Sequence, residues 1–309
     1  MSYLIRKLQY QDIRMMNQLY EEIFIKSKPL FVKISHTKVR DPVFWNLYLK
    51  KNSLSSFCIE EDNRMIGFCF SHIIGDWVWL GPVGIHPVFQ NKGYGKALLN
   101  RQEEEIFFSG KKGIILESKP NIENIAYYTR LGYINHDVHY RVLIYSDKIS
   151  HSPYKFKWKC FDGIDYDQRK DLSFLSERFG IDYMNEMKYF SENQIGKSYS
   201  FENDNVNGVL FFVSHSTYLK ENPFLNIKLL AMNTTDLVEI RDVIFSIARH
   251  FLKKGYGYTV FTLSMNYLDL LKLIPKNVGK LVYNNFVFQK GNHQFINKCN
   301  YFYSFSWTG

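Results

Sequence analysis

The sequence predicts a mixed α/β protein whose two halves follow a similar order of strands and helices. Strand-like and helix-like segments alternate along the chain, and three successive strands near the start favour a mostly antiparallel beginning of the sheet. A length of 309 residues is long for one core and sufficient for two domains. Apolar residues make up 46% of the chain and aromatic residues 17%, which excludes a disordered chain.

The first half reads as strand, helices, three strands, helix, strand, helix, strand. Asp12 can cap the first helix, Pro42 suits the first turn of the second, and Gly110 and Gly132 can end the last two. The predicted strands are Tyr3–Leu8, Phe57–Glu60, Met65–Ile73, Trp77–Ile85, Gly113–Glu117 and Tyr140–Tyr145. The predicted helices are Asp12–Phe24, Asp41–Lys50, Gly95–Phe108 and Ile122–Leu131.

A polar, proline-containing segment, Ser146–Tyr154, is the predicted linker. We therefore expect one domain over residues 1–148 and a second over residues 149–309. The predicted helices of the second half are Leu172–Arg178, Asp236–Leu252 and Tyr267–Ile274. Its predicted strands are Ser198–Glu202, Gly208–Ser214, Leu225–Met232, Tyr258–Leu263, Leu281–Phe288 and Tyr301–Trp307. The shared order suggests duplication followed by divergence.

The charge and the cysteines exclude several classes of protein. The formal net charge is +9, but no run of five like charges occurs, so we expect no nucleic-acid partner. The four cysteines have no CxxC spacing and no neighbouring His cluster, so we expect neither a metal site nor a disulfide framework. The N-terminus lacks an apolar signal core, and no apolar run reaches about 18 residues. These features predict a cytoplasmic protein without a membrane partner.

The most informative segment lies between a strand and a helix, over Val83–Leu98 (VGIHPVFQNKGYGKAL). The first amide groups of a helix lack internal partners and lie at the positive end of its dipole. Gly93 and Gly95 let the backbone curve around a phosphate, and Lys92 and Lys96 add positive charge. The segment therefore predicts an anion-binding loop.

Two nucleotide-binding alternatives fit this segment less well. A P-loop needs a longer glycine spacing that ends in GK[ST]. A dinucleotide fingerprint needs a third glycine, and Leu98 stands at that position. A tight turn without a ligand remains the alternative for two glycines taken alone.

Four segments together resemble the GNAT superfamily of N-acetyltransferases. Gln90–Gly95 (QNKGYG) resembles the Q/R-x-x-G-x-G/A pyrophosphate loop of this family, and Val83–Pro87 is similar to the strand that precedes it. Asn124–Tyr133 (NIAYYTRLGY) resembles the family's N-[VI]-x-F-Y-x-x-x-G-F helix, and Ile114–Ser118 (IILES) resembles a strand of many members. The resemblance covers roughly Tyr3–Tyr145 and implies the GNAT acyltransferase fold for the first half.

The resemblance also implies acetyl-CoA as the acyl donor and gives each matching residue a role. The backbone of the loop would hold the CoA pyrophosphate, through Gln90, Asn91, Lys92, Gly93, Tyr94, Gly95 and Lys96. The strand Val83, Gly84, Ile85 would pair with the pantetheine arm, and an N–H of Val83 or Ile85 would polarise the thioester carbonyl. Asn124 or Asn121 would contact the cofactor from the opposite side, together with Tyr127. Tyr128 matches the tyrosine that donates a proton to the departing thiolate, and a phenol is protonated at neutral pH.

The general base is less well defined by the sequence. A base is needed because an ammonium group cannot attack a thioester, and a group with a pKa near the working pH serves best. Glu117 is the first candidate, on a strand expected to end near the thioester. Asp76, His72 and His86 are the others, and a chain of water molecules is a further alternative.

The second half resembles a GNAT unit that has lost its cofactor loop. Asn233–Asp236 stands where a second loop is expected, but it has no glycine and leads into an acidic helix start. The layout is similar to that of tandem-GNAT proteins with a degenerate C-terminal domain. We expect this half to shape the acceptor pocket or to support a homodimer.

The expected reaction is transfer of acetyl from acetyl-CoA to a primary amine of a small molecule or peptide, by direct attack in a ternary complex. A non-catalytic acyl-CoA-binding or regulatory protein is the alternative, and it would bind CoA without turnover.

Overall fold

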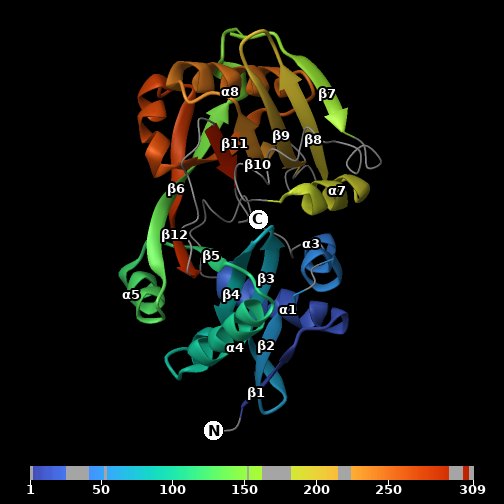
Figure 1. Ribbon diagram of the computed structural model, residues 1–309, viewed down its shortest axis with the longest axis vertical. Helices are drawn as coiled ribbons and strands as arrows, with labels where there is room; N and C mark the ends of the chain where they lie inside the picture. Colours follow the sequence, from blue (N-terminus) through green and yellow to red (C-terminus); the bar gives the residue numbers. More distant parts are fainter. Residues whose placement is uncertain are drawn as a thin grey trace. The chain divides into compact units, whose positions relative to one another are not determined.

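The computed structural model describes residues 3–25, 42–51, 54–151, 153–161, 182–214, 224–291 and 302–305 (Figure 1). The chain packs as two compact units, each assembled from several segments. Unit 1 comprises Met1–Glu117, Glu123–Asn135 and Phe288–Phe295, and unit 2 comprises Ser118–Ile122, His136–Val287 and Ile296–Gly309. Both units draw on both halves of the sequence, and the domain boundary after residue 148 stays a prediction. No helix in the described ranges is long and apolar enough to cross a membrane.

Unit 1 has its strands in the order β1-β2-β3-β4-β5 and carries helices on both faces, and the end of β12 (Gly279–Gly291) lies beside β5. Its elements are β1 (Tyr3–Lys7), η1 (Tyr10–Asp12), α1 (Ile13–Tyr20), η2 (Glu21–Ile25), α3 (Pro42–Asn46), η3 (Leu47–Lys51), β2 (Phe57–Glu61), β3 (Arg64–Ile74), β4 (Trp77–Ile85), η4 (Pro87–Phe89), α4 (Tyr94–Phe108), β5 (Gly113–Ser118), most of α5 (Ile122–Arg130) and the start of β6 (Ile134–Tyr145). The pairs β1–β2, β2–β3 and β3–β4 are antiparallel, and β5 runs parallel to β4.

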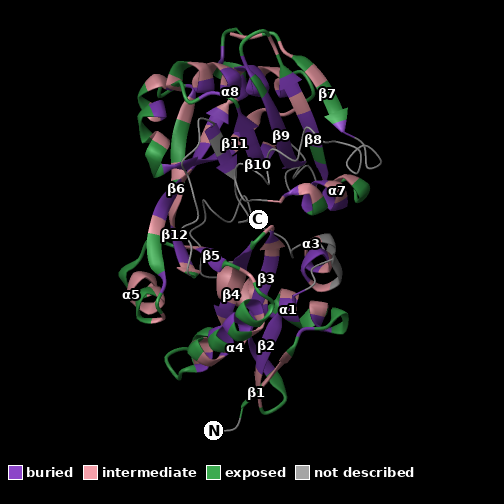
Figure 2. Cartoon of the chain, in the orientation of Figure 1, coloured by how far each residue is buried: buried purple, intermediate pink, exposed green. Residues whose placement is uncertain are grey.

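The two faces of this sheet bury different side chains, because successive residues of a strand point to opposite faces. Phe68 and Phe70 of β3 pack with Met16 of α1 and Trp45 of α3 in one apolar cluster. Cys69, between them, faces α4: burial first, and the Glu103 carboxylate of α4 second, raise the pKa of its thiol. Figure 2 shows the central strands of unit 1 as mostly buried.

A buried polar contact fastens the end of β12 (Gly279–Gly291) to unit 1. The Lys290 Nζ atom lies 2.5 Å from Glu103 Oε2, and the Tyr133 hydroxyl donates a hydrogen bond of 2.8 Å to Glu103 Oε1. Burial, reinforced by the Glu103 carboxylate, raises the pKa of Tyr133. A lysine from the last part of the sequence therefore neutralises a nearly buried carboxylate of α4.

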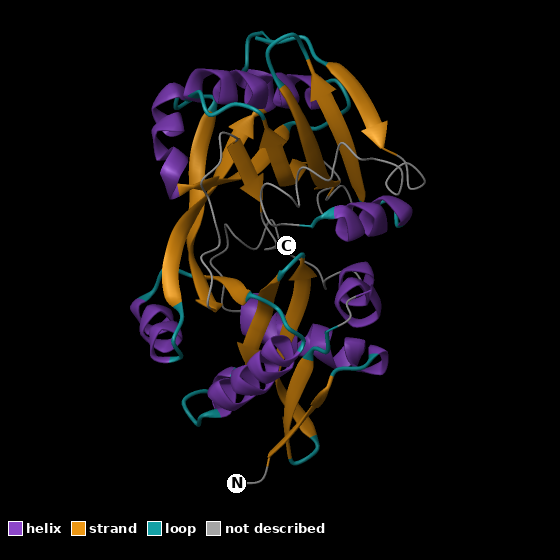
Figure 3. Ribbon diagram, in the orientation of Figure 1, coloured by secondary structure: helices purple, strands orange, loops and turns teal. Residues whose placement is uncertain are grey.

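Unit 2 has its strands in the order β12-β6-β11-β10-β9-β8-β7, with parallel and antiparallel pairs, and β13 pairs with β10 outside this path. Its remaining elements are η5 (Ser146–Lys148), β7 (Lys157–Phe161), α7 (Met184–Glu192), β8 (Gly196–Glu202), β9 (Asn207–Ser214), β10 (Phe224–Met232), α8 (Leu237–Leu252), β11 (Tyr258–Ser264), η8 (Met265–Leu273) and β13 (Phe302–Phe305). Helix α8 lies against the strands of unit 2 (Figure 3). Its apolar residues Ile244 and Ile247 are fully buried in one cluster with Phe212 and Phe261 of the sheet.

Most predicted elements are confirmed, with differences at their ends. The helix expected over Asp12–Phe24 is divided into η1, α1 and a π-helical turn, η2. The strand expected at Tyr140–Tyr145 begins earlier, at Ile134. The apolar pattern missed its first part because that part contains buried polar residues such as Asp137 and His139. The helix expected near Tyr267 is a 3-10 helix, η8. The helix expected over Leu172–Arg178 lies outside the described residues.

Candidate functional site

The outer edge of β4 is the first feature of the candidate site. The parallel register between β4 and β5 joins Trp77–Trp79 to Gly113–Ile115. Within residues 54–151, which are described without a gap, no ladder continues from Leu80 to Ile85 on the β5 side. The two strands therefore separate, and the second part of β4 is paired with β3 alone.

The hydrogen-bond pattern shows which groups face this gap. The His86 N–H donates a bond of 2.8 Å to the Ile66 carbonyl of β3. In an antiparallel pair, backbone groups alternate between the partner strand and the opposite side. The N–H groups of Val83 and Ile85 therefore point away from β3 and into the gap, whereas that of Gly84 points toward β3. This geometry fits the two amides that the sequence assigns to the acyl donor.

The gap ends at the loop that leads into α4. The Gln90 side-chain amide donates a bond of 2.9 Å to the Ile85 carbonyl, which is one of the groups that face outward. Asn91 and Gly93 have positive φ angles of 63° and 86°, so the loop turns sharply before the helix begins. Glycine adopts such an angle at no steric cost, which explains its presence at position 93.

The N-terminus of α4 is open to an anion. Gly93 is the N-cap residue, and within the continuously described range 54–151 no side chain caps this end of the helix. No acidic residue lies in its first turn. Lys92 and Lys96 are exposed, and the Lys92 Nζ atom lies 5.2 Å from the centroid of the Phe89 ring. A phosphate group at this end would meet backbone N–H groups, the positive end of the helix dipole and two cations.

Tyr94 has a different side-chain role from its neighbours. Its ring is 3% exposed, and its hydroxyl hydrogen-bonds to Glu61 of β2. The side chain therefore anchors the first turn of α4 to the sheet, and only the backbone of Tyr94 is directed to the predicted anion site.

The two tyrosines of α5 lie in different surroundings. A Cβ atom at Gly95 would lie 2.8 Å from the Tyr127 hydroxyl, so this hydroxyl lies against the first turn of α4. Burial raises the pKa of Tyr127, so it stays protonated at neutral pH. The Tyr128 ring packs against Tyr133 at 5.7 Å and against Phe288 of β12 at 5.3 Å. The sequence could not place a residue of β12 beside the tyrosine expected to be catalytic.

The two asparagines expected near the cofactor differ in exposure. Asn124 is half-buried on α5, one helical turn before Tyr128, so both lie on the same side of the helix. Asn121 is exposed and precedes the helix, and its N–H donates to the Lys119 carbonyl at 2.9 Å.

Two of the alternative bases are engaged elsewhere. The Asp76 carboxylate is exposed at the start of β4 and forms an ion pair with Lys112, which lowers its pKa. Val83 lies seven positions after Asp76, which corresponds to about 23 Å in an extended chain. The His86 Nδ1 atom accepts from the Val88 N–H at 3.3 Å, and its Nε2 atom lies 3.2 Å from a Glu22 carboxylate oxygen. With both ring nitrogens bonded, His86 joins η2 to the loop and has no lone pair for a substrate.

The other two candidates differ in position. His72 is 3% exposed, and its ring lies 5.7 Å from Tyr48 on the face that packs against α1 and α3. Glu117 is half-buried near the end of β5, beyond Ile115, the last residue of β5 in register with β4. Glu117 therefore lies on the diverging part of β5, next to the gap, and it stays the predicted base.

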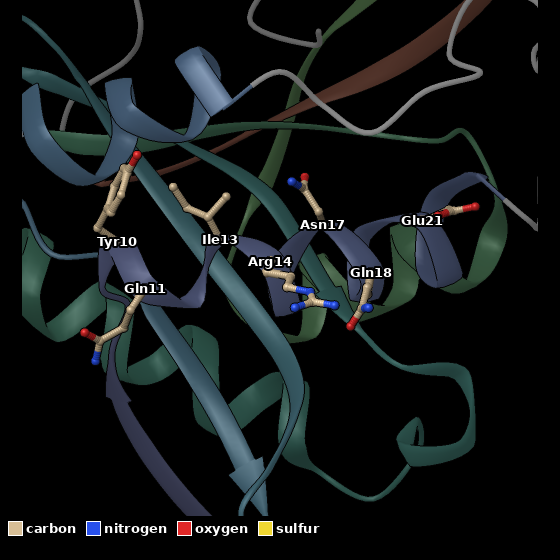
Figure 4. Close-up of a pocket in the computed structure, with 7 residues that line it drawn as sticks. All are labelled: Tyr10, Gln11, Ile13, Arg14, Asn17, Gln18 and Glu21. Carbon is tan, nitrogen blue, oxygen red and sulfur yellow. The ribbon is translucent and has the colours of Figure 1, made fainter.

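A surface pocket in unit 1 lies away from these residues (Figure 4). It follows η1 and α1, and it is lined by Tyr10, Gln11, Ile13, Arg14, Asn17, Gln18 and Glu21. None of the predicted site residues lines it. The chemistry is indicated by the gap beside β4 and by the open end of α4, so we place the candidate site there.

The sequence did not predict the contacts that η2 makes with β4 and with His86. A Cβ atom at Gly84 would lie 3.0 Å from Ile23 and 3.2 Å from Phe24, so η2 packs directly against β4. Glu22, in the same short element, holds His86. The helical pattern of residues 13–24 predicted an element here, but no local signal predicted which strand it would contact.

Comparisons with known proteins concern the family and the fold. Residues 14–133 match the model of the acetyltransferase (GNAT) family. A search of the curated proteins returned no match.

Solved structures resemble most of the chain, as three examples show. A protein from Pyrococcus horikoshii described as an acetyltransferase is 12% identical, with a TM-score of 0.64 over 94% of this chain and 90% of its own. A tandem GNAT protein from the clavulanic acid biosynthesis pathway is 9% identical, with a TM-score of 0.59 over 94% and 98%. A GCN5-related N-acetyltransferase from Kribbella flavida is 11% identical, with a TM-score of 0.56 over 94% and 71%. These likenesses confirm the predicted fold, with its second GNAT-like α/β domain.

Proposed function

We propose that the protein transfers acetyl from acetyl-CoA to a primary amine of a small molecule or peptide, and the match of residues 14–133 to the acetyltransferase (GNAT) family model supports this proposal. The observation that carries the proposal is the open N-terminus of α4 beside the unpaired edge of β4. One feature suits a pyrophosphate and the other suits an amide-containing arm, and the loop Gln90–Gly93 joins them.

The residues present fit acetyl-CoA at this site. Backbone N–H groups of Gly93–Lys96 bind the pyrophosphate, with Lys92 and Lys96 beside it. The outward groups of Val83 and Ile85 hydrogen-bond the pantetheine arm, as a neighbouring strand would. When bound, acetyl-CoA supplies an activated acyl group in the form of a thioester.

The chain's own groups then serve the transfer to the amine. An N–H of Val83 or Ile85 polarises the thioester carbonyl, and a donor aimed at a developing oxyanion contributes about 3–4 kcal/mol. Glu117 takes a proton from the acceptor ammonium, which frees the nitrogen lone pair for attack on the carbonyl carbon. As the carbon–sulfur bond breaks, the Tyr128 hydroxyl donates its proton to the sulfur. The phenolate then regains a proton from the attacking nitrogen, which leaves the neutral amide, free CoA thiol and a protonated Tyr128. The transfer occurs directly between two bound substrates, without an acylated residue of the protein.

The first experiment measures acetyl-CoA binding by calorimetry on wild type and on a matched pair of variants, Gly93→Asn and Gly93→Asp. Both substitutions introduce a side chain of the same shape into a left-handed position that Asn and Asp tolerate, and only the second adds a charge. Saturable binding that the Asp variant loses and the Asn variant largely keeps supports the pyrophosphate site. No binding by folded wild type would overturn the proposal.

The second experiment separates catalysis from binding alone. Wild type is incubated with acetyl-CoA and a panel of primary amines, and free thiol release is measured with Tyr128→Phe as a control. Release that depends on the amine and on Tyr128 supports transfer. Tight binding without release on any amine would favour a non-catalytic acyl-CoA-binding protein.

A further inference from the structure

Unit 2 repeats the strand arrangement that forms the gap in unit 1. Its parallel pair, β10 and β11, is in register over Phe224–Asn226 and Tyr258–Val260. Among the described residues the ladder ends there, although β10 continues to Met232 and is followed by α8. The same order, a parallel pair that separates before a helix, holds for β4, β5 and α4.

In unit 2 a strand of the chain itself occupies this gap. The four residues of β13 pair antiparallel with β10, from Leu229 opposite Phe305 to Met232 opposite Phe302. On its other side, the Ser304 hydroxyl donates a hydrogen bond to the Thr262 carbonyl of β11. β13 therefore lies between the two separated strands and bonds to both.

Phe302 anchors this strand. Its side chain is fully buried in the unit 2 core, and its ring lies 4.9 Å from Tyr267, edge to face. Its N–H donates a bond of 2.8 Å to the Thr234 carbonyl, just beyond the end of β10. Burial of this apolar side chain and the backbone ladder therefore hold the strand together.

The Asp236 side chain caps the N-terminus of α8, which follows β10. The Asp236 carboxylate accepts hydrogen bonds from the Val238 and Glu239 N–H groups, at 2.9 and 2.8 Å. These are the amides that an anion at the helix N-terminus would use. Glu239 adds a second negative charge in the first turn.

We propose that the β10–β11 gap is a strand-binding groove that β13 fills in cis, and that β13 and Asp236 together exclude acyl-CoA from unit 2. The chain then has one cofactor site. The cofactor half of this inference rests on the proposed function, whereas the groove and its occupant do not.

Hydrogen exchange on the full chain, with and without acetyl-CoA, tests both halves. Without ligand, the amides of Leu229–Met232 exchange slowly, and those of Val83 and Ile85 exchange at least about 10-fold faster, because among the residues that the structure describes only the first set has strands on both sides. Added acetyl-CoA slows exchange at Val83, Ile85 and α4, leaves β10 and the start of α8 unchanged, and titrates to one equivalent per chain. Protection at β10 or α8 on adding acetyl-CoA, or a second equivalent, overturns the single site.

Phe302→Asp, with Phe302→Leu as its matched control, tests the occupant. The Asp variant raises exchange at Leu229–Met232 by about 100-fold, and the Leu variant by less than about 10-fold, because only Asp places a charge in the core. Unchanged exchange in the Asp variant overturns the proposal that β13 fills the β10–β11 gap. If that variant does not fold, the difference in exchange rate between the β10 and β4 amides of wild type still tests whether the groove is occupied. If no acetyl-CoA binds anywhere, the proposed function fails while the exchange of β10 still tests the groove.

Discussion

The helices α4 and α8 follow equivalent strands in the two units, but their N-termini differ in whether they can bind an anion. Each follows the first strand of a separated parallel pair. α4 begins at Gly93, which offers no side chain, and two exposed lysines lie beside it. α8 begins at Asp236, whose own carboxylate takes the first amides of the helix. The fold supplies the dipole in both units, and the residue at the cap decides whether an outside anion can use it.

The gaps beside the two helices differ in the same sense. The edge of β4 from Leu80 to Ile85 has no strand on the β5 side within the continuous range 54–151. The corresponding edge of β10 is completed by β13. An unpaired backbone edge needs a hydrogen-bonding partner, and the two units meet that need differently: β13 in one, and in our proposal a ligand in the other.

The largest expected effect is a loss of kcat on removal of a single hydroxyl of unit 1, because our proposal places all catalysis in that unit. Tyr128→Phe keeps the ring contacts with Tyr133 and Phe288 but removes the proton donor. We expect kcat to fall about 100-fold or more, with little change in acetyl-CoA affinity.

Steady-state kinetics and calorimetry on the same preparations check this, with Tyr127→Phe as the neighbouring control. The Tyr127 hydroxyl lies against Gly95, so its loss should alter binding more than kcat. A normal kcat for Tyr128→Phe together with a large loss for Tyr127→Phe would exchange the roles of the two tyrosines.

A carboxylate at the start of α4 should make it resemble α8. Gly93→Asp should weaken acetyl-CoA binding by about 100-fold, or about 2.7 kcal/mol, because a fixed negative charge replaces an open anion site. Gly93→Asn should cost less than about 10-fold. Calorimetry at two salt concentrations checks this, since a charge effect shrinks at high salt. Equal losses in both variants would show that shape, not charge, is responsible.

The reverse change in unit 2 should affect stability and not binding. Asp236→Ala removes the cap of α8 and should lower the free energy of unfolding by about 1 kcal/mol, whereas Asp236→Asn should cost less. Urea denaturation measures both. Acetyl-CoA should still bind with one equivalent, because β13 remains in the gap. A second equivalent in Asp236→Ala would mean that the cap alone had excluded the cofactor.

The smallest expected effect is a pH dependence in unit 2. Burial, with the charges of Lys254 and Lys253, lowers the pKa of His250 from 6.5 to about 4. Between these values the unfolded chain binds more protons than the folded one, so this contribution to stability is present above pH 6.5 and is lost as pH falls toward 4. The effect should stay below about 1 kcal/mol, because the ring is only half-buried. Urea denaturation of wild type and His250→Gln at pH 7.5, 6 and 5 measures it. An identical pH dependence in both would exclude His250 as its source.

The candidate site illustrates how far the sequence could be interpreted. The glycines at 93 and 95, the lysines beside them and the strand Val83–Ile85 all lie within one short segment, so their spacing alone predicted a phosphate loop at a helix start. His86 lies in the same segment, yet its role depends on Glu22, far away in the sequence. The sequence could not predict that both ring nitrogens of His86 are bonded, because it contains no information on which side chain meets this ring.

The sequence by itself determined the class of fold, the loop before α4 and the absence of such a loop before α8. These features depend on backbone freedom at glycine, on helix capping and on periodicity, which act between residues a few positions apart. Only the tertiary structure decided that Lys290 reaches Glu103, that Phe288 packs on Tyr128 and that β13 fills the gap of unit 2. These contacts join residues far apart in the chain, and they form because unpaired strand edges and buried charges need partners that local sequence does not specify.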